Sequence, residues 1–315
     1  MVERDGLTMA ESAIPAGARE ILPAPRPPRP GASAFRGARR AAGIVPFAVY
    51  MILGLGAPAV AVAVGAFQSE AGSATLHNVY IATHGIYLHS FAITFELALI
   101  TAVVPGILGF LIGYAIYTAK KGELLRRVTI TASGVFANFG GVPLAFLFVA
   151  TLGNTGIATG WLTHIGFNPY NNGFNLYGLG GVALVYLYFQ IPLMVLVMLP
   201  AFEGLRPAWR EAAENLGARG WHYWRYIAGP VLMPSFLGCV LLLFGSAFSA
   251  YATAEALTSG SIPLTAILIG SFLNGNVLAG QANVGKALGL GMVLIIAVLM
   301  VFYALLQRRA AKWLR

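Results

Sequence analysis

The sequence contains little charge and almost no cysteine for its length. Only 10% of its 315 residues are charged and 58% are hydrophobic, whereas about a quarter of a water-soluble domain is charged. This deficit excludes an ordinary soluble globular protein and indicates that lipid surrounds most of the chain. The single cysteine, Cys239, lies in an apolar run. One cysteine excludes an intrachain disulfide and a cysteine-based metal cluster.

Six apolar segments are long enough to cross a bilayer, which takes about 20 residues of helix. They cover roughly Ile44–Phe67, Ser90–Ala119, Val128–Leu152, Leu179–Phe202, Val231–Leu257 and Gly285–Gln307. The first begins too far into the chain and is too long for a signal-peptide core, so we expect no cleaved signal peptide. The sequence therefore predicts an all-α membrane protein with six transmembrane helices.

The basic residues are distributed unevenly between the two ends of these spans. Of the 20 Lys and Arg residues, seven precede the first span, four follow the second, four follow the fourth and four follow the sixth. Lys286 alone falls on the other side. The positive-inside rule then places both termini in the cytoplasm. The net charge of +9 thus records topology and does not indicate a nucleic-acid partner.

Outside the spans, the composition predicts one tail and two structured outer loops. Residues 1–43 are rich in Pro, Arg and Ala and cannot bury a core, so we expect a disordered basic tail. The alternative is that this segment is a proline-rich ligand of another protein.

We expect a short interfacial helix around Ile157–Ile165, and we expect the loop Thr258–Val284 to turn back toward the membrane. Gly109 and Gly113 are spaced for close helix packing inside a bundle.

The segment between spans four and five is polar and amphipathic. It reads EAAENLGARGWHYWRYIAGP from residue 211 to residue 230. Because Gly217 is a natural helix stop, we expect two short amphipathic helices joined there, near the inner membrane surface. They could rest on lipid headgroups. Alternatively they dock a protein, with Ala212 and Ala213 allowing close approach and Glu211 pairing with a cation of the partner.

This segment resembles the EAA loop of binding-protein-dependent ABC importer permeases. The usual form is EAA, three residues, G, nine residues, I, one residue, LP. The sequence keeps that spacing with EAA at 211–213, Gly217, Ile227 and Pro230, but it has Gly229 where leucine is usual. The resemblance covers roughly residues 90–309. It implies a MetI-like permease fold of six transmembrane helices, with a cytoplasmic coupling helix between spans four and five.

The resemblance also implies a division of the chain and a set of partners. The first transmembrane helix, at 44–67, precedes a permease core at 88–309 that contains the EAA loop at 203–230, and 310–315 form a second cytoplasmic tail. The expected partners are two ATP-binding subunits, a second permease (identical or homologous), an extracytoplasmic solute-binding protein and the lipid bilayer of a bacterial-type plasma membrane. Carried over by position, the ATPase-docking residues are Glu211, Ala212, Ala213, Gly217, Ile227 and Pro230.

Within that family the sequence resembles the spermidine/putrescine-type branch, which also includes iron(III), thiamine and phosphonate systems. The similarity rests on AFEGLRPAWREAAENLGA and on SAFSAYATAEALTSG at the exit from span five. Charge within a span is costly, so Glu96 and Glu255 are either carboxylates that reach interfacial water or groups that meet a cationic solute. The second alternative favours a polyamine or similar cation. The residues expected along the translocation path are Glu96, Asn138, Gln190, Tyr251 and Glu255, with Ser246, Ser249 and Thr253 as further polar positions.

The sequence contains no pattern for catalysis by this chain alone. GQANVGKA at 280–287 has the spacing of a phosphate-binding loop, but Ala287 replaces the Mg²⁺-binding Ser or Thr and the stretch falls on the outer side. None of the five histidines has metal-ligand spacing. We therefore expect no cofactor here, and ATP and Mg²⁺ on a separate ATPase. A stand-alone secondary transporter or channel is the alternative of another class, although no inverted repeat is evident. A membrane scaffold without a path is a third.

Overall fold

The computed structural model describes residues 45–119, 123–275, 281 and 283–313. The tail expected at 1–43 lies outside these residues, as do Lys120 and Lys121. The chain divides into two units, Met1–Pro58 and Ala59–Arg315. The described part of the first unit is helical, and the helix continues to Ala66 through a π-helical turn, η1 (Ile52–Gly56), and α2 (Ala57–Ala66).

The second unit is a bundle of helices. Among the described residues the only β-type pairing is an isolated bridge between Gln68 and Ala74. Helix α14 continues to Trp313, into the segment where the sequence predicted a separate tail. The helices after α2 are α3 (His77–Ala82), α4 (Gly85–Thr118), α5 (Glu123–Asn138), α6 (Gly141–Leu152), α7 (Ile157–His164), α8 (Leu179–Glu203), α9 (Pro207–Asn215), α10 (Gly220–Tyr223), α11 (Gly229–Ser249), α12 (Ala252–Thr258), α13 (Thr265–Leu273) and α14 (Val284–Trp313), with a 3₁₀ turn η2 (Tyr170–Asn172) and a π turn η3 (Trp224–Ala228).

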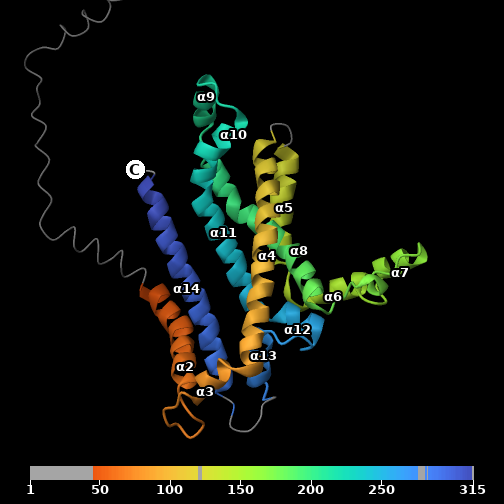
Figure 1. The fold of residues 1–315 in the computed structure, drawn as a ribbon, viewed down its shortest axis with the longest axis vertical. Coiled ribbons are helices and arrows are strands. Elements are labelled where there is room, and N and C mark those ends of the chain that lie inside the picture. Colours follow the sequence, from red (N-terminus) through yellow and green to blue (C-terminus); the bar gives the residue numbers. More distant parts are fainter. Residues whose placement is uncertain (1–44, 120–122, 276–280, 282, 314–315) are drawn as a thin grey trace, which may run out of the picture. The chain divides into compact units, whose positions relative to one another are not determined.

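Six helical segments are long and apolar enough to cross a membrane, which confirms the all-α prediction. They are Val45–Ala66, Gly85–Thr118, Gly141–His164, Leu179–Glu203, Gly220–Ser249 and Val284–Arg308. In the second unit, α9 and α10 lie at one end of α8 and α11, whereas α3 and α13 lie at the other end (Figure 1). This arrangement separates the predicted docking segment from the predicted outer loops.

Helices α4, α8 and α11 pack side by side and form the core of the second unit (Figure 1). Glycines permit a close approach of α4 to α8. A methyl group on Gly109 would lie 2.8 Å from the carbonyl oxygen of Ile191, and one on Gly113 would lie 3.0 Å from the ring of Phe202. The predicted packing role of this glycine pair is therefore confirmed.

The third apolar segment is broken, which the sequence did not predict. Instead of one helix over Val128–Leu152, α5 ends at Asn138 and α6 begins at Gly141. Gly141 has a φ of +73°, a backbone conformation that residues with a Cβ rarely adopt. Its backbone N–H donates to Thr253 Oγ1 at 2.8 Å instead of to a helical carbonyl. The Phe-Gly-Gly sequence therefore separates two helices.

The fifth segment is broken in the same region. The helix predicted over Val231–Leu257 ends at Ser249, and α12 resumes at Ala252. Ala250 is extended, with ψ of 117°, and its carbonyl accepts a hydrogen bond from Tyr186 Oη at 3.2 Å. Helix α12 packs against α6, so the two breaks lie together.

Both elements predicted for the outer loops form, but one of them lies within a candidate span. Helix α7 occupies Ile157–His164, where an interfacial helix was expected, and forms the end of the third candidate span, Gly141–His164. Helix α13 packs against α4 and α14, two of the apolar spans, as a returning loop requires. The backbone N–H of Thr265, the first residue of α13, donates to Thr94 Oγ1 at 2.9 Å. This buried bond fixes the start of α13 on α4.

Candidate functional site

Helix α9 is a short amphipathic helix that projects from the end of the bundle (Figure 1). It starts with Pro207, whose missing N–H costs nothing at a first helical position. Ala213 anchors it with only 5% of its surface exposed. Leu216, just past its end, is 88% exposed. An apolar side chain so exposed at the end of a helix is a surface available to a partner.

Gly217 ends this element with a φ of +76°. The N–H groups of Gly217 and Ala218 donate to the carbonyls of Glu214 and Ala213, at 2.9 Å and 3.0 Å. These two bonds satisfy carbonyls that the end of a helix otherwise leaves free. The sequence correctly placed this stop, because a glycine in the left-handed region is a local signal.

The second predicted amphipathic helix is not a separate helix. Residues 220–249 are helical without interruption, so Ile227 and Pro230 belong to the start of the fifth span. The π turn η3 precedes Pro230 and contains Ile227. A methyl group on Gly229 would lie 2.6 Å from the carbonyl oxygen of Trp224. This contact explains why glycine, not the leucine usual in the family motif, suits this position.

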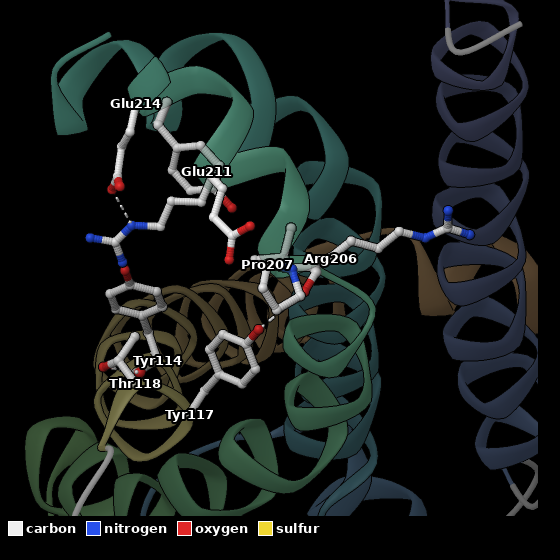
Figure 2. A pocket seen from close by; sticks show the side chains of 10 residues that line it. Tyr114, Tyr117, Thr118, Arg206, Pro207, Glu211 and Glu214 are labelled. Atoms are coloured by element: carbon white, nitrogen blue, oxygen red, sulfur yellow. Dashed lines mark hydrogen bonds and ion pairs between the residues drawn. The ribbon is translucent and has the colours of Figure 1, made fainter. Parts of the chain in front are cut away.

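A pocket of about 560 Å³ lies between α9 and the end of α4 (Figure 2). Its walls come from four elements: α4, the connection after α8, α9 and α10. The ten residues that line it are Tyr114, Tyr117, Thr118, Leu205, Arg206, Pro207, Arg210, Glu211, Glu214 and Tyr223. The pocket therefore adjoins the predicted docking residues and also the second span.

The charged side chains at this pocket differ in their partners. Arg210 Nε donates to Glu214 Oε1 at 2.9 Å, one helical turn away. That hydrogen bond raises the pKa of the Arg210 guanidinium above its ordinary value. Arg206 extends away from the tyrosines (Figure 2), with its guanidinium 5.9 Å from the centre of the Trp209 ring. Glu211 points into the pocket (Figure 2) and makes no hydrogen bond or ion pair with any described residue.

Aromatic side chains connect this pocket to the bundle. The rings of Tyr114 and Trp224 meet edge to face with centroids 4.8 Å apart. Tyr117 stacks on Phe202 at 6.0 Å, and its hydroxyl donates to the Leu205 carbonyl at 3.1 Å. These contacts join α4, α8 and η3 beside the pocket.

Of the five residues predicted along the path, the structure brings two together. Asn138 and Tyr251 both line a pocket of about 380 Å³ where the two helix breaks meet. Ser246 and Thr253 line it as well. Gln190 is fully buried on α8; its Nε2 donates to the Leu243 carbonyl at 2.8 Å, and its Oε1 has no partner among the described residues.

The two predicted carboxylates lie on different helices. Glu96 is exposed on α4. Glu255 lies on α12, one turn beyond Tyr251, and its buried Oε2 has no hydrogen-bond partner among the described residues. The sequence missed Tyr114, Tyr117 and Thr118 as pocket residues. The available signal was a pair of tyrosines three residues apart at the end of an apolar span, where aromatic residues favour the interface.

A multi-pass helical bundle with an exposed amphipathic helix between its fourth and fifth spans defines a class of transport permeases. The sequence profile of the binding-protein-dependent transport system inner membrane components matches residues 105–315. The chain belongs to this family of ABC importer permeases, whose members are transport subunits and not catalytic ones.

Individual relatives carry several different names. The thiamine transport system permease protein ThiP of Salmonella typhimurium is 32% identical over 87 residues, which are 28% of this chain and only 16% of that protein. A probable sulfate transport system permease protein, cysT, of Nephroselmis olivacea is 25% identical over 218 residues, covering 68% of this chain and 71% of that protein.

Solved structures share the fold. A crystal structure of a bacterial ABC transporter involved in the import of the acidic polysaccharide alginate has a chain that superposes with a TM-score of 0.69, covering 88% of this chain and 97% of that one at 16% identity. A second alginate ABC transporter structure, in complex with an alginate pentasaccharide-bound periplasmic protein, gives 0.67 at 17% identity.

Proposed function

We propose that this chain forms half of the translocation path of an ATP-driven importer and that α9 couples it to a separate ATPase subunit. The observation that carries this proposal is the exposed surface of α9, with Leu216 88% exposed. Glu211, Ala212 and Gly217 lie on the same projecting segment and would contact the ATPase. Ile227 and Pro230 act behind it, at the start of the fifth span.

The same proposal assigns partners and orientation. Two ATPase subunits bind ATP and Mg²⁺, a second permease completes the path, and an extracytoplasmic binding protein delivers the solute. Four arginines lie in or near α9 at this end of the bundle, and under the positive-inside rule they support a cytoplasmic position for it. They are Arg206, Arg210, Arg219 and Arg225. That orientation places both termini in the cytoplasm of a bacterial-type plasma membrane.

Co-purification with its ATPase tests the docking role. We expect Leu216→Arg and Glu211→Lys each to reduce recovery of the ATPase with the permease, and to lower solute-stimulated ATP turnover about tenfold or more, as for the loss of a central interface contact. Ala71→Lys is the control, because Ala71 is exposed in the loop before α3. Full ATP turnover by both docking variants would refute the role of α9. Solute uptake without any ATPase would instead support a stand-alone transporter or channel.

For the solute, we propose a small organic cation, with a polyamine as the first candidate. The supporting observation is Glu255 on α12, beyond the end of the fifth span at Ser249, whose buried Oε2 has no partner among the described residues. A carboxylate oxygen buried without a partner is stabilised by a cationic ligand. Thiamine is the second candidate, since relatives carry that name and thiamine is itself a cation. The sequence also left iron(III) and a phosphonate as alternatives, and a phosphonate, as an anion, would contradict the cationic assignment.

Uptake into proteoliposomes distinguishes these solutes. We expect the complete transporter, supplied with its binding protein, to import putrescine or thiamine and not sulfate. Glu255→Gln should lower uptake at limiting solute while the protein remains folded. Glu96→Gln removes the other carboxylate predicted along the path, which is exposed on α4, and should lower uptake less. Import of an anion with unchanged activity of Glu255→Gln would overturn the cationic assignment.

A further inference from the structure

The pocket beneath α9 has the composition of a site for a small cation. Glu211 is the charged side chain that points into it without a partner among the described residues (Figure 2). Arg210 and Glu214 neutralise each other, and Arg206 extends away. Two arginines and two glutamates are thus among the described lining residues, and Glu211 is the one of the four that points into the cavity without a partner.

Three tyrosines supply aromatic rings that can bind a cation. Tyr114, Tyr117 and Tyr223 surround the same space, and aromatic faces attract ammonium and guanidinium groups within about 6 Å. The Thr118 hydroxyl adds a hydrogen-bonding group at the wall. An unpaired carboxylate among aromatic rings is an arrangement that recognises organic amines.

The size of the cavity favours a free ligand over a single side chain. Its volume of about 560 Å³ falls within the range of roughly 300–1,000 Å³ typical of small-molecule sites. One lysine or arginine side chain from a partner would fill only part of it.

We propose that this pocket binds a small organic cation from the cytoplasm and that the bound cation regulates coupling. The regulatory part rests on the proposed docking role of α9. The ligand bridges Glu211 on α9 to Tyr114 and Tyr117 on α4. It thereby competes with the ATPase for the Glu211 carboxylate and fixes α9 against the second span. Because coupling requires α9 to move with the ATPase, an occupied pocket lowers ATP turnover.

Binding is tested on the full chain in lipid nanodiscs, without the ATPase. The probe is phenethylammonium, and phenethyl alcohol is its uncharged counterpart. We expect saturable binding of the cation by calorimetry below about 10 mM, at least tenfold weaker for Glu211→Gln and Tyr114→Leu. Tyr114→Phe, which keeps the ring, and Glu255→Gln, which alters the path, should bind as the unchanged chain does.

Three results would overturn the site. They are absence of binding up to about 10 mM, equal binding of the alcohol, and loss of binding in Glu255→Gln with retention in Glu211→Gln. The last result would locate the cation in the translocation path. Normal binding by Tyr114→Phe guards against misfolding as the cause of a loss in Tyr114→Leu.

Regulation is tested on the complete transporter. Phenethylammonium on the ATPase side should reduce solute-stimulated ATP turnover severalfold, with each variant compared with its own rate in the absence of probe. Tyr114→Leu should abolish this inhibition and Tyr114→Phe should retain it. Equal inhibition of both variants would refute the regulatory role. If the ATPase does not bind the permease at all, the docking proposal fails, while binding to the nanodisc-embedded chain still tests the pocket.

Discussion

At the scale of single residues, side-chain hydroxyls replace the backbone hydrogen bonds that the helix breaks remove. Thr253 accepts the N–H of Gly141, and Tyr186 donates to the carbonyl of Ala250. Within lipid, an unpaired backbone group costs several kcal/mol, so irregular backbone persists only where such partners exist. The pocket at the two breaks is thus maintained by a few polar side chains.

Thr253→Val should destabilise the protein because it leaves the Gly141 N–H without its acceptor. We expect a loss of about 1–3 kcal/mol of unfolding free energy, measured by thermal denaturation in detergent micelles with tryptophan fluorescence. Thr253→Ser keeps the hydroxyl and is the matched control. Equal stability of the Val and Ser variants would show that Gly141 finds another partner.

At the scale of elements, the π turn η3 determines how the docking segment joins the fifth span. It occupies Trp224–Ala228, directly before Gly229 and Pro230. Proline cannot donate the backbone hydrogen bond that an α-helix requires, so irregular turns commonly accompany it. The wider π turn of η3 accommodates the hydrogen bond that Pro230 cannot donate. The helix is therefore continuous from α10 into α11.

Replacing Gly229 by the leucine usual in the family motif should therefore destabilise this chain. The new Cβ would lie 2.6 Å from the Trp224 carbonyl oxygen. We expect a cost of about 1–3 kcal/mol, as for other substitutions that force a backbone shift, together with reduced solute-stimulated ATP turnover. Gly220→Ala, where a methyl group meets no atom within 4 Å, is the control. A Gly229→Leu variant that unfolds at the same temperature as the unchanged chain would contradict the role assigned to η3.

The contact between α4 and α8 gives a second prediction for a pair of helices. Gly109→Ala would place a methyl group 2.8 Å from the Ile191 carbonyl oxygen, and we expect a loss of about 1–3 kcal/mol. In contrast, Gly134→Ala on α5 meets nothing within 4 Å. It should be neutral or stabilise the helix by up to about 1 kcal/mol. The same denaturation assay compares the two, and a smaller loss for Gly109→Ala than for Gly134→Ala would exclude this close contact.

At the scale of the whole molecule, the spans separate two chemically different ends. The α9 end carries Arg206, Arg210, Arg219 and Arg225, whereas Lys286 lies at the start of α14, where α3 packs. Its aliphatic stem contacts Gly65, so the position of this cation depends on a glycine of α2. The distribution supports a single orientation in the membrane.

Single-cysteine labelling tests that orientation, because the chain has one native cysteine and it is buried. In a Cys239→Ala background, Ala71→Cys should react with a membrane-impermeant maleimide added outside intact cells. Leu216→Cys should react only after the membrane is opened. Both positions are exposed in the permease. When the permease is expressed without its ATPase, which would cover Leu216, access to the reagent alone decides the result. The reverse pattern would invert the topology and place α9 outside.

Much of the membrane architecture follows from local sequence. Long apolar runs predict spans because a helix satisfies its own backbone groups in lipid. Gly217 and Pro207 mark the ends of α9 because each acts within one turn of helix. The two helix breaks, after α5 and after α11, differ in whether the local sequence signals them. Gly140 and Gly141 offered a local signal for the first, whereas the second, at Ala250 and Tyr251, contains neither Gly nor Pro.

The sequence by itself determined the number of apolar spans, the uneven basic charge and the amphipathic helix before the fifth span, because each depends on residues close together in the chain. It misplaced the third span, which covers Gly141–His164 and not Val128–Leu152. Only the tertiary structure decided which polar residues meet. Tyr114 and Glu211 are far apart in sequence, as are Asn138 and Tyr251, yet each pair lines one pocket. Their proximity depends on helices packing through glycines and hydroxyls from other segments, and no short stretch of sequence contains that information.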